Sequence, residues 1–160
     1  PGRVGRSAAP DSASLGAGAR HPRDPRATRP GIYFSRMHES HGKRVHIILL
    51  DARFFRSKLK PSKDKSQKGA ERYLPSDAKD QAMLGKEQWA WLESELKKEA
   101  DLRVLISGVQ VLAEDHGYEC WRNLPAERDR LLTLLAQTQT APLIILSGDR
   151  HMESSIESEP

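Results

Sequence analysis

Large aliphatic residues gather in three short runs along the chain, at residues 45–51, 102–110 and 143–147. The runs are apolar at successive positions and rich in β-branched residues, which is typical of strands buried on both faces of a parallel sheet. The second run contains a Ser-Gly pair, and the third ends in a serine that glycine follows directly; glycine allows the chain to turn sharply out of a sheet. The pattern therefore predicts three parallel strands.

Three further elements follow from the same pattern. Residues 32–36 form a shorter strand-like run, and a His-Gly-Lys turn signal separates it from residues 45–51, so the two are expected to pair as a hairpin. Apolar residues recur at helical spacing over residues 84–100 and again over residues 125–137, which begin with proline. The order strand, helix, strand, helix, strand predicts an α/β fold with helices packed on a parallel sheet.

Two segments have a different composition. Residues 1–30 contain no aromatic residue and only two large aliphatic ones, so they cannot bury enough apolar area to offset their ordering entropy. We expect this Arg/Pro/Gly-rich segment to be disordered, or to be an artefact of gene prediction; a basic tail for RNA or anionic lipid is the functional alternative. Residues 54–82 are polar and lysine-rich, and are predicted to be an exposed loop with a solvated lysine face.

The charge distribution and the cysteine content exclude several classes of protein. The net charge of +4 arises within residues 1–30, which carry six Arg and two Asp, and residues 31–160 hold equal numbers of basic and acidic residues. Without a basic excess in the folded part, no nucleic-acid partner is expected. Cys120 is the only cysteine, which excludes a disulfide framework, and it is expected to be a small buried residue. The chain shows neither a membrane-spanning run nor a signal peptide.

Polar groups follow the carboxyl ends of the predicted strands, where open α/β sheets bind their ligands. Asp149 and His151 follow the last strand, Gln110 ends the middle one, and Asp51 and Arg53 follow the first. A carboxylate and a neutral imidazole suit a divalent metal, although a surface loop that happens to hold both is the simpler alternative. Arg53 has two interpretations: an ion pair with Asp51 that shapes the loop, or a fork that binds phosphate oxygens.

Five motifs occur in a fixed order: LLDARFFR, MLGKEQWAWLESEL, ISGVQVL, ECWRNLPAERDRLL and LSGDRHM. Together they resemble the PhoD-like alkaline phosphatases, a branch of the calcineurin-like metallophosphatase group, and the resemblance covers Gly31 to about Ser155. It implies part of a four-layer α/β/β/α sandwich with a metal cluster at the strand ends. The metals that the resemblance implies for this cluster are iron and calcium, and relatives suggest manganese or zinc as alternatives.

The resemblance also assigns roles to individual residues. The stretch from Gly148 to His151 matches the PhoD-like motif, so Asp149 and His151 are the implied metal ligands. His151 and Arg53 are the expected catalytic residues. Arg53, Arg150 and Gln110 are the expected substrate-binding residues, because guanidinium groups can offset charge on a phosphate. Gln110 lies near the position where the wider group usually has a histidine. His116, a loop histidine away from the strand ends, is expected to matter little.

The family's earlier motifs should precede residue 31, so residues 31–160 look like the C-terminal portion of a PhoD-like catalytic domain whose N-terminal half is missing. The expected function of the parent protein is metal-dependent hydrolysis of small-molecule phosphate esters, with the isolated fragment inactive. The alternative is a non-catalytic α/β fragment or degenerate paralogue that serves as an interaction module. Loss of half a sandwich should leave one sheet face uncovered.

Overall fold

The computed structural model describes residues 24–148, apart from residues 65, 79 and 139. Most of the segment predicted to be disordered, residues 1–23, lies outside the described residues. The same holds for residues 149–160, which follow the last strand.

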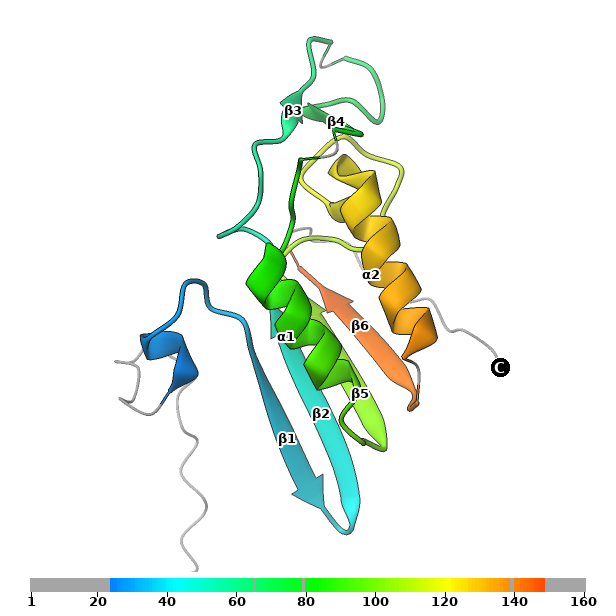
Figure 1. Cartoon of the computed structure of the whole chain (residues 1–160). Coiled ribbons are helices and arrows are strands. Elements are labelled where there is room, and N and C mark those ends of the chain that lie inside the picture. The colour runs from blue at the N-terminus through cyan, green and yellow to red at the C-terminus, as the bar shows by residue number, and fades with distance from the viewer. Residues whose placement is uncertain (1–23, 65, 79, 139, 149–160) are drawn as a thin grey trace, which may run out of the picture.

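The main sheet has four strands in the order β1-β2-β5-β6, with β1 antiparallel to β2 and the other neighbours parallel (Figure 1). Its strands are β1 (Phe34–Ser40), β2 (Lys43–Leu50), β5 (Leu102–Ser107) and β6 (Leu143–Ser147). This arrangement confirms the predicted hairpin and parallel strands. β5 ends before residue 110, because the Ser107 hydroxyl donates to the carbonyl of Val109 (2.7 Å) and closes a turn there.

The β1–β2 hairpin closes through His41 and Gly42, whose φ angles are 51° and 71°. Positive φ at both central residues defines a two-residue type I′ turn, which matches the right-handed twist of paired strands. The His-Gly signal in the sequence therefore marks the turn correctly.

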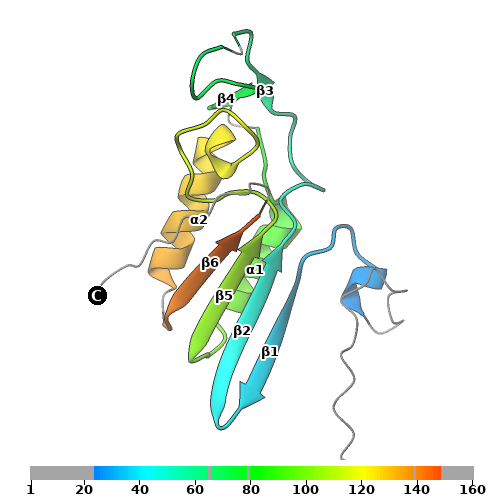
Figure 2. The ribbon, with the colours of Figure 1, turned by 180° about the vertical axis from the view of Figure 1, so that it is seen from behind.

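Two helices cover one face of the sheet: α1 (Lys86–Leu96) links β2 to β5, and α2 (Pro125–Gln137) links β5 to β6. Figures 1 and 2 show both helices on the same side, with the opposite face of the sheet turned toward the viewer in Figure 2. α2 has the predicted bounds, whereas α1 is shorter than residues 84–100. It begins after Gly85, where φ is 74° and a β-carbon would lie 3.2 Å from the Phe55 ring.

The core lies between the helices and this sheet face. One carboxylate joins the beginnings of the two helices: Glu127 Oε2 on α2 accepts the backbone N–H of Met83 (2.6 Å) and the indole N–H of Trp89 (3.0 Å). The rings of Trp89 and Trp121 meet edge to face at 6.4 Å. Fully buried aliphatic residues complete the core: Ile48, Leu84, Leu92, Leu105, Val109, Val111 and Leu131.

A buried polar cluster interrupts the core near the amino end of the parallel strands. His46 Nε2 lies 3.1 Å from Glu95 Oε2 on α1, and the same carboxylate accepts hydrogen bonds from Ser35 Oγ (2.7 Å) and Lys98 Nζ (2.7 Å). Burial lowers the pKa of His46. Burial alone would raise the pKa of Glu95, but hydrogen bonds from Lys98 and Ser35 outweigh it and lower that pKa.

The other face of the sheet is apolar and open. Ile144 and Leu146 are 45% and 50% exposed, and Ile47, Leu49 and their β5 neighbours are only half-buried. None of the helices within the described ranges lies on this face (Figure 2). The mixed α/β fold is thus as predicted, while the second pair of layers remains a prediction. No helix in the described part of the chain is long and apolar enough to cross a membrane.

Residues 54–82, predicted to be one long loop, contain a small second sheet. Its two-residue strands β3 (Lys60–Pro61) and β4 (Tyr73–Leu74) pair antiparallel. Figure 1 shows this hairpin beyond the carboxyl edge of the main sheet. Two single-turn 3-10 helices, η1 (Pro25–Ala27) and η2 (Trp121–Asn123), complete the described elements.

Candidate active site

Asp51 shapes the turn that follows β2. It is 8% exposed, and its Oδ1 accepts the backbone N–H groups of Arg53 (3.1 Å) and Phe54 (2.9 Å). Its Oδ2 accepts the N–H of Ile32 (2.8 Å). Gln88 on α1 braces the same residue by accepting the Asp51 N–H (2.8 Å) and donating to its carbonyl (3.0 Å). Asp51 is therefore a structural residue that directs Arg53 away from the strand.

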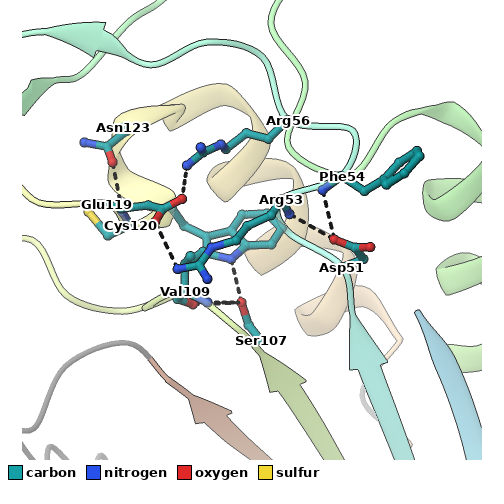
Figure 3. A network of polar contacts seen from close by, with 10 residues as sticks. Asp51, Arg53, Phe54, Arg56, Ser107, Val109, Glu119, Cys120 and Asn123 are labelled. Carbon is teal, nitrogen blue, oxygen red and sulfur yellow. Dashed lines mark hydrogen bonds and ion pairs between the residues drawn. The ribbon is translucent and has the colours of Figure 1, made fainter. Parts of the chain in front are cut away.

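Two arginines after β2 share one carboxylate (Figure 3). Arg53 Nη2 donates to Glu119 Oε2 (3.0 Å), and Arg56 Nη1 donates to Glu119 Oε1. The Arg53 side chain is 53% exposed, against 21% for Arg56 and 24% for Glu119. The sequence left two interpretations of Arg53, an ion pair that shapes the loop and a fork that binds phosphate. The bond to Asp51 that shapes the loop comes from the backbone N–H of Arg53. The guanidinium contacts the Glu119 carboxylate, whose oxygens are acceptors like those of a phosphate.

Gln110 follows the end of β5, and both its backbone and its side chain are held in place. It forms an isolated parallel bridge with Cys120, and its carbonyl accepts the N–H of Trp121 (2.9 Å). His116 Nδ1 accepts the N–H of Tyr118 (3.1 Å), which leaves the ring proton on Nε2 for donation to Gln110 Oε1 (2.6 Å). The amide oxygen of Gln110 thus accepts from His116, and the amide N–H groups can donate to a ligand oxygen.

The turns after β5 and β6 are tied to each other. The N–H of Gly148 donates to the carbonyl of Ser107 (3.0 Å), and the Ser107 hydroxyl accepts the indole N–H of Trp121 (3.0 Å). A β-carbon on Gly148 would lie 3.7 Å from the carbonyl oxygen of Gly108. The two Ser-Gly pairs noted in the sequence are thus neighbours at the carboxyl edge of the sheet.

The described residues at this edge do not form a metal site by themselves. The Asp51 and Glu119 carboxylates are engaged as above, and burial raises the pKa of the Cys120 thiol, which keeps it protonated. The predicted burial of Cys120 is confirmed. Within the described ranges no three His, Cys, Asp or Glu side chains gather as metal ligands would. A metal site here would need donors from outside these residues.

The structure brings Arg53 and Gln110 to the same edge, on the two strand ends that the sequence indicated. Asp149, Arg150 and His151 lie outside the described residues, so their roles stay predictions. His116 was expected to be an ordinary loop histidine, yet it is 4% exposed and holds Gln110. Burial of a loop residue leaves no periodic signal in a sequence.

Two residues of the site escaped the sequence analysis, Arg56 and Glu119. Their contact spans 63 residues of chain, so no local spacing reveals it. The one available signal is that Arg53 and Arg56 stand three residues apart after a strand end, which brings two positive charges close together. Two guanidiniums need an acceptor between them, and the structure supplies Glu119.

Comparison with known proteins places these observations in a family. The model of the PhoD-like phosphatase family matches residues 22–160. A solved structure of PhoD is similar in fold, with a TM-score of 0.53 and 24% sequence identity over 73% of this chain. This chain spans 23% of the length of that PhoD chain. None of the curated proteins compared with the chain matches it. From the motif order, the fold and the matched range, this chain belongs to the PhoD-like phosphatase family.

Proposed function

We propose that this chain supplies the phosphate-binding edge of a metal-dependent hydrolase of phosphate monoesters or diesters. Membership of the PhoD-like phosphatase family indicates phosphoesterase function. The observation that carries the proposal is the pair of guanidiniums, Arg53 and Arg56, that meets one carboxylate at the carboxyl edge of the parallel strands. This is the edge at which open α/β sheets bind their ligands.

The residues at this edge have distinct tasks in the proposal. The half-exposed Arg53 exchanges Glu119 for the oxygens of a substrate phosphate, because both present acceptors to the same guanidinium fork. Arg56 is less exposed and retains Glu119, which keeps that carboxylate from repelling the phosphate. Gln110, held by His116 through its amide oxygen, donates N–H to a further phosphoryl oxygen.

Metal binding in the proposal falls to Asp149 and His151, with Arg150 offsetting substrate charge. A carboxylate and an imidazole are suitable donors, and the cations considered are iron with calcium, or else manganese or zinc. When bound, such cations stabilise charge on phosphoryl oxygens and acidify the attacking water. His151 is either a ligand or the proton donor to the leaving group.

Activity in the proposal also depends on groups beyond this chain, because the chain spans 23% of the PhoD chain it resembles. Catalytic metal sites typically use three or more protein ligands, and Asp149 with His151 provides two. We therefore expect the isolated chain to bind transition metals weakly and to leave both monoester and diester test substrates intact.

The test uses the full-length protein that contains this chain, loaded in turn with iron and calcium, manganese or zinc. Turnover of p-nitrophenyl phosphate and bis(p-nitrophenyl) phosphate is measured together with metal content by elemental analysis. Asp149→Asn and His151→Ala are expected to lower turnover by orders of magnitude and to reduce bound metal. Arg53→Gln is expected to raise KM with metal content unchanged.

The control is His38→Ala, which removes an exposed histidine on β1 away from the carboxyl edge. It should preserve turnover and metal content. If the Asp149 and His151 variants together kept full metal and full turnover, the proposed site would be wrong. A wild-type full-length protein without hydrolysis under any metal would instead favour the alternative of a non-catalytic interaction module.

A further inference from the structure

The carboxylate of Glu119 occupies the arginine to which the proposed function assigns the substrate phosphate. Its Oε2 accepts from Arg53 Nη2 (3.0 Å), and its Oε1 accepts from Arg56 Nη1 (Figure 3). A carboxylate and a phosphate offer similar acceptor oxygens to a guanidinium, so the two compete for the same N–H groups. Arg53 therefore already holds an anionic group that belongs to the chain itself.

The backbone that carries this carboxylate is fixed on both sides of Glu119. Two residues earlier, the carbonyl of Gly117 accepts two backbone N–H groups from the start of β4. One residue later, Cys120 is 1% exposed and forms a parallel bridge with Gln110. The loop therefore holds the Glu119 backbone beside Arg53, and the contact between them can open only through rotation of the two side chains.

The exposure of the two arginines decides which of them can release the carboxylate. The Arg53 side chain is 53% exposed, so water can solvate its guanidinium during an exchange of partners. The Arg56 side chain is only 21% exposed, and no acceptor among the described residues lies within hydrogen-bond reach of its buried Nε. Loss of Glu119 would leave Arg56 with a poorly solvated charge, which is costly. Glu119 therefore stays with Arg56 when a phosphate displaces it from Arg53.

We propose that Glu119 is an internal competitor for phosphate at Arg53, which weakens the hold of the site on phosphate and promotes release of the product. The inference rests on the proposed function and adds how the affinity of that site is controlled. The carboxylate contacts Arg53 when no phosphate is bound and returns to it as phosphate leaves. Each binding event must therefore break the ion pair between Glu119 and Arg53, which subtracts from the affinity for phosphate.

The proposal predicts the opposite sign from a purely structural role. If Glu119 only held Arg53 and Arg56 in position, its removal would let the guanidiniums move and would weaken phosphate binding. If Glu119 competes, its removal leaves Arg53 available and strengthens phosphate binding. The direction of the change in affinity therefore separates the two roles.

The test variant is Glu119→Gln in the metal-loaded, full-length protein that contains this chain. The amide keeps the shape of the side chain and an acceptor for Arg56, but it lacks the charge that attracts Arg53. The matched control is Glu114→Gln, which removes the same charge from an ion pair in the same loop, with Arg128 Nη1 (2.6 Å). The Glu114 side chain is 64% exposed and is not part of the proposed site.

The affinity for inorganic phosphate is measured by isothermal titration calorimetry, and as a Ki against turnover of p-nitrophenyl phosphate. An ion pair of this exposure changes an equilibrium by at most about fivefold, so Glu119→Gln should bind phosphate about two to five times more tightly. KM should fall by a similar factor, and the control should match the wild type. Glu119→Ala, which removes both ion pairs, should also bind phosphate more tightly, and it replaces the first variant if that one does not fold.

A double-mutant cycle tests whether the effect passes through Arg53. In an Arg53→Gln background the competition has no target, so Glu119→Gln should leave the affinity for phosphate unchanged. A simple loss of negative charge would instead strengthen binding by the same factor with or without Arg53. That result, or equal effects of Glu119→Gln and Glu114→Gln, would overturn the proposal.

The proposal and the proposed function can fail separately. Hydrolysis by the wild-type protein together with unchanged or weaker phosphate binding in Glu119→Gln would overturn the competition and leave the proposed function standing. Phosphate binding without hydrolysis under any metal would refute the proposed hydrolysis, and tighter binding in Glu119→Gln would then still support the competition. Phosphate binding that Arg53→Gln leaves unchanged would overturn the competition, because phosphate would then not bind at Arg53.

Discussion

Asp51→Asn offers a direct test of how the fold positions Arg53. The side chain changes little in shape, but a carboxylate with two acceptor oxygens becomes an amide with one. Three backbone N–H groups depend on these oxygens: Arg53 and Phe54 on Oδ1, and Ile32 on Oδ2. Asparagine oriented to serve the first two must direct its own N–H₂ toward the N–H of Ile32, so two donors face each other.

The expected cost follows from these contacts. A hydrogen bond to a charged acceptor contributes about 1.5–3 kcal/mol and a neutral one about 1 kcal/mol. The substitution abolishes one charged bond and weakens two, and at 8% exposure little water can replace them. We expect the free energy of unfolding to fall by about 3 kcal/mol. This is a large part of the total for a domain whose stability is typically about 5–15 kcal/mol.

Urea unfolding followed by tryptophan fluorescence measures this cost, since Trp89 and Trp121 are buried in the core. The control is Asp101→Asn. Its carboxylate also accepts bonds, from Arg44 N (2.8 Å) and Lys43 Nζ (3.0 Å), but at the surface, where water can replace them and the loss of stability should be much smaller. Equal losses at the two positions, or a loss below about 1 kcal/mol at Asp51, would refute the reasoning.

Three further outcomes are expected. Burial depresses the pKa of His46, so as the pH falls the imidazole is protonated in the unfolded chain before it is protonated in the folded one, and the free energy of unfolding should decline below pH 6.5. His46→Gln should flatten that decline in urea titrations from pH 8 to 5. An equally steep decline in the variant would contradict this cause. The open sheet face should bind the dye ANS, with less fluorescence in Ile144→Thr/Leu146→Thr; an ANS-silent, monodisperse wild-type chain would contradict the uncovered face. Gly117→Ala should speed tryptic cleavage within residues 57–74, because its β-carbon would lie 2.5 Å from the Glu71 nitrogen and disturb the bonds from Arg72 and Tyr73 to the Gly117 carbonyl; unchanged digestion would contradict this.

The parallel strands could be predicted because they are runs of consecutive apolar residues, and α2 because its buried residues recur at helical spacing. Leu102–Ser107 and Leu143–Ser147 are apolar on both faces, and Pro125 marks the first turn of α2. The β3–β4 hairpin could not be predicted, because its strands have two residues each and its stability comes from contacts with a distant loop. Local patterns carry no information about such contacts.

The candidate site was predictable in part for the same reason. Arg53 and Gln110 follow strand ends, and parallel strands bring their ends to one edge. The partners that hold them, Glu119 and His116, sit on an irregular loop whose course the sequence pattern does not specify. The assignment of Asp149 and His151 rests on motif and family, and awaits the metal and turnover measurements.

The strand order β1-β2-β5-β6 has a consequence for the order in which the sheet can assemble during synthesis. Each strand pairs with the one that precedes it in this sheet along the chain, so the sheet can grow by successive addition from its amino-terminal side. β6 (Leu143–Ser147) is then the last strand to join. We expect a nascent chain released before β6 to retain the hairpin and the first crossover but to lack the stretch that carries Asp149 and His151. Under the proposed function, assembly of the scaffold would therefore precede completion of the site.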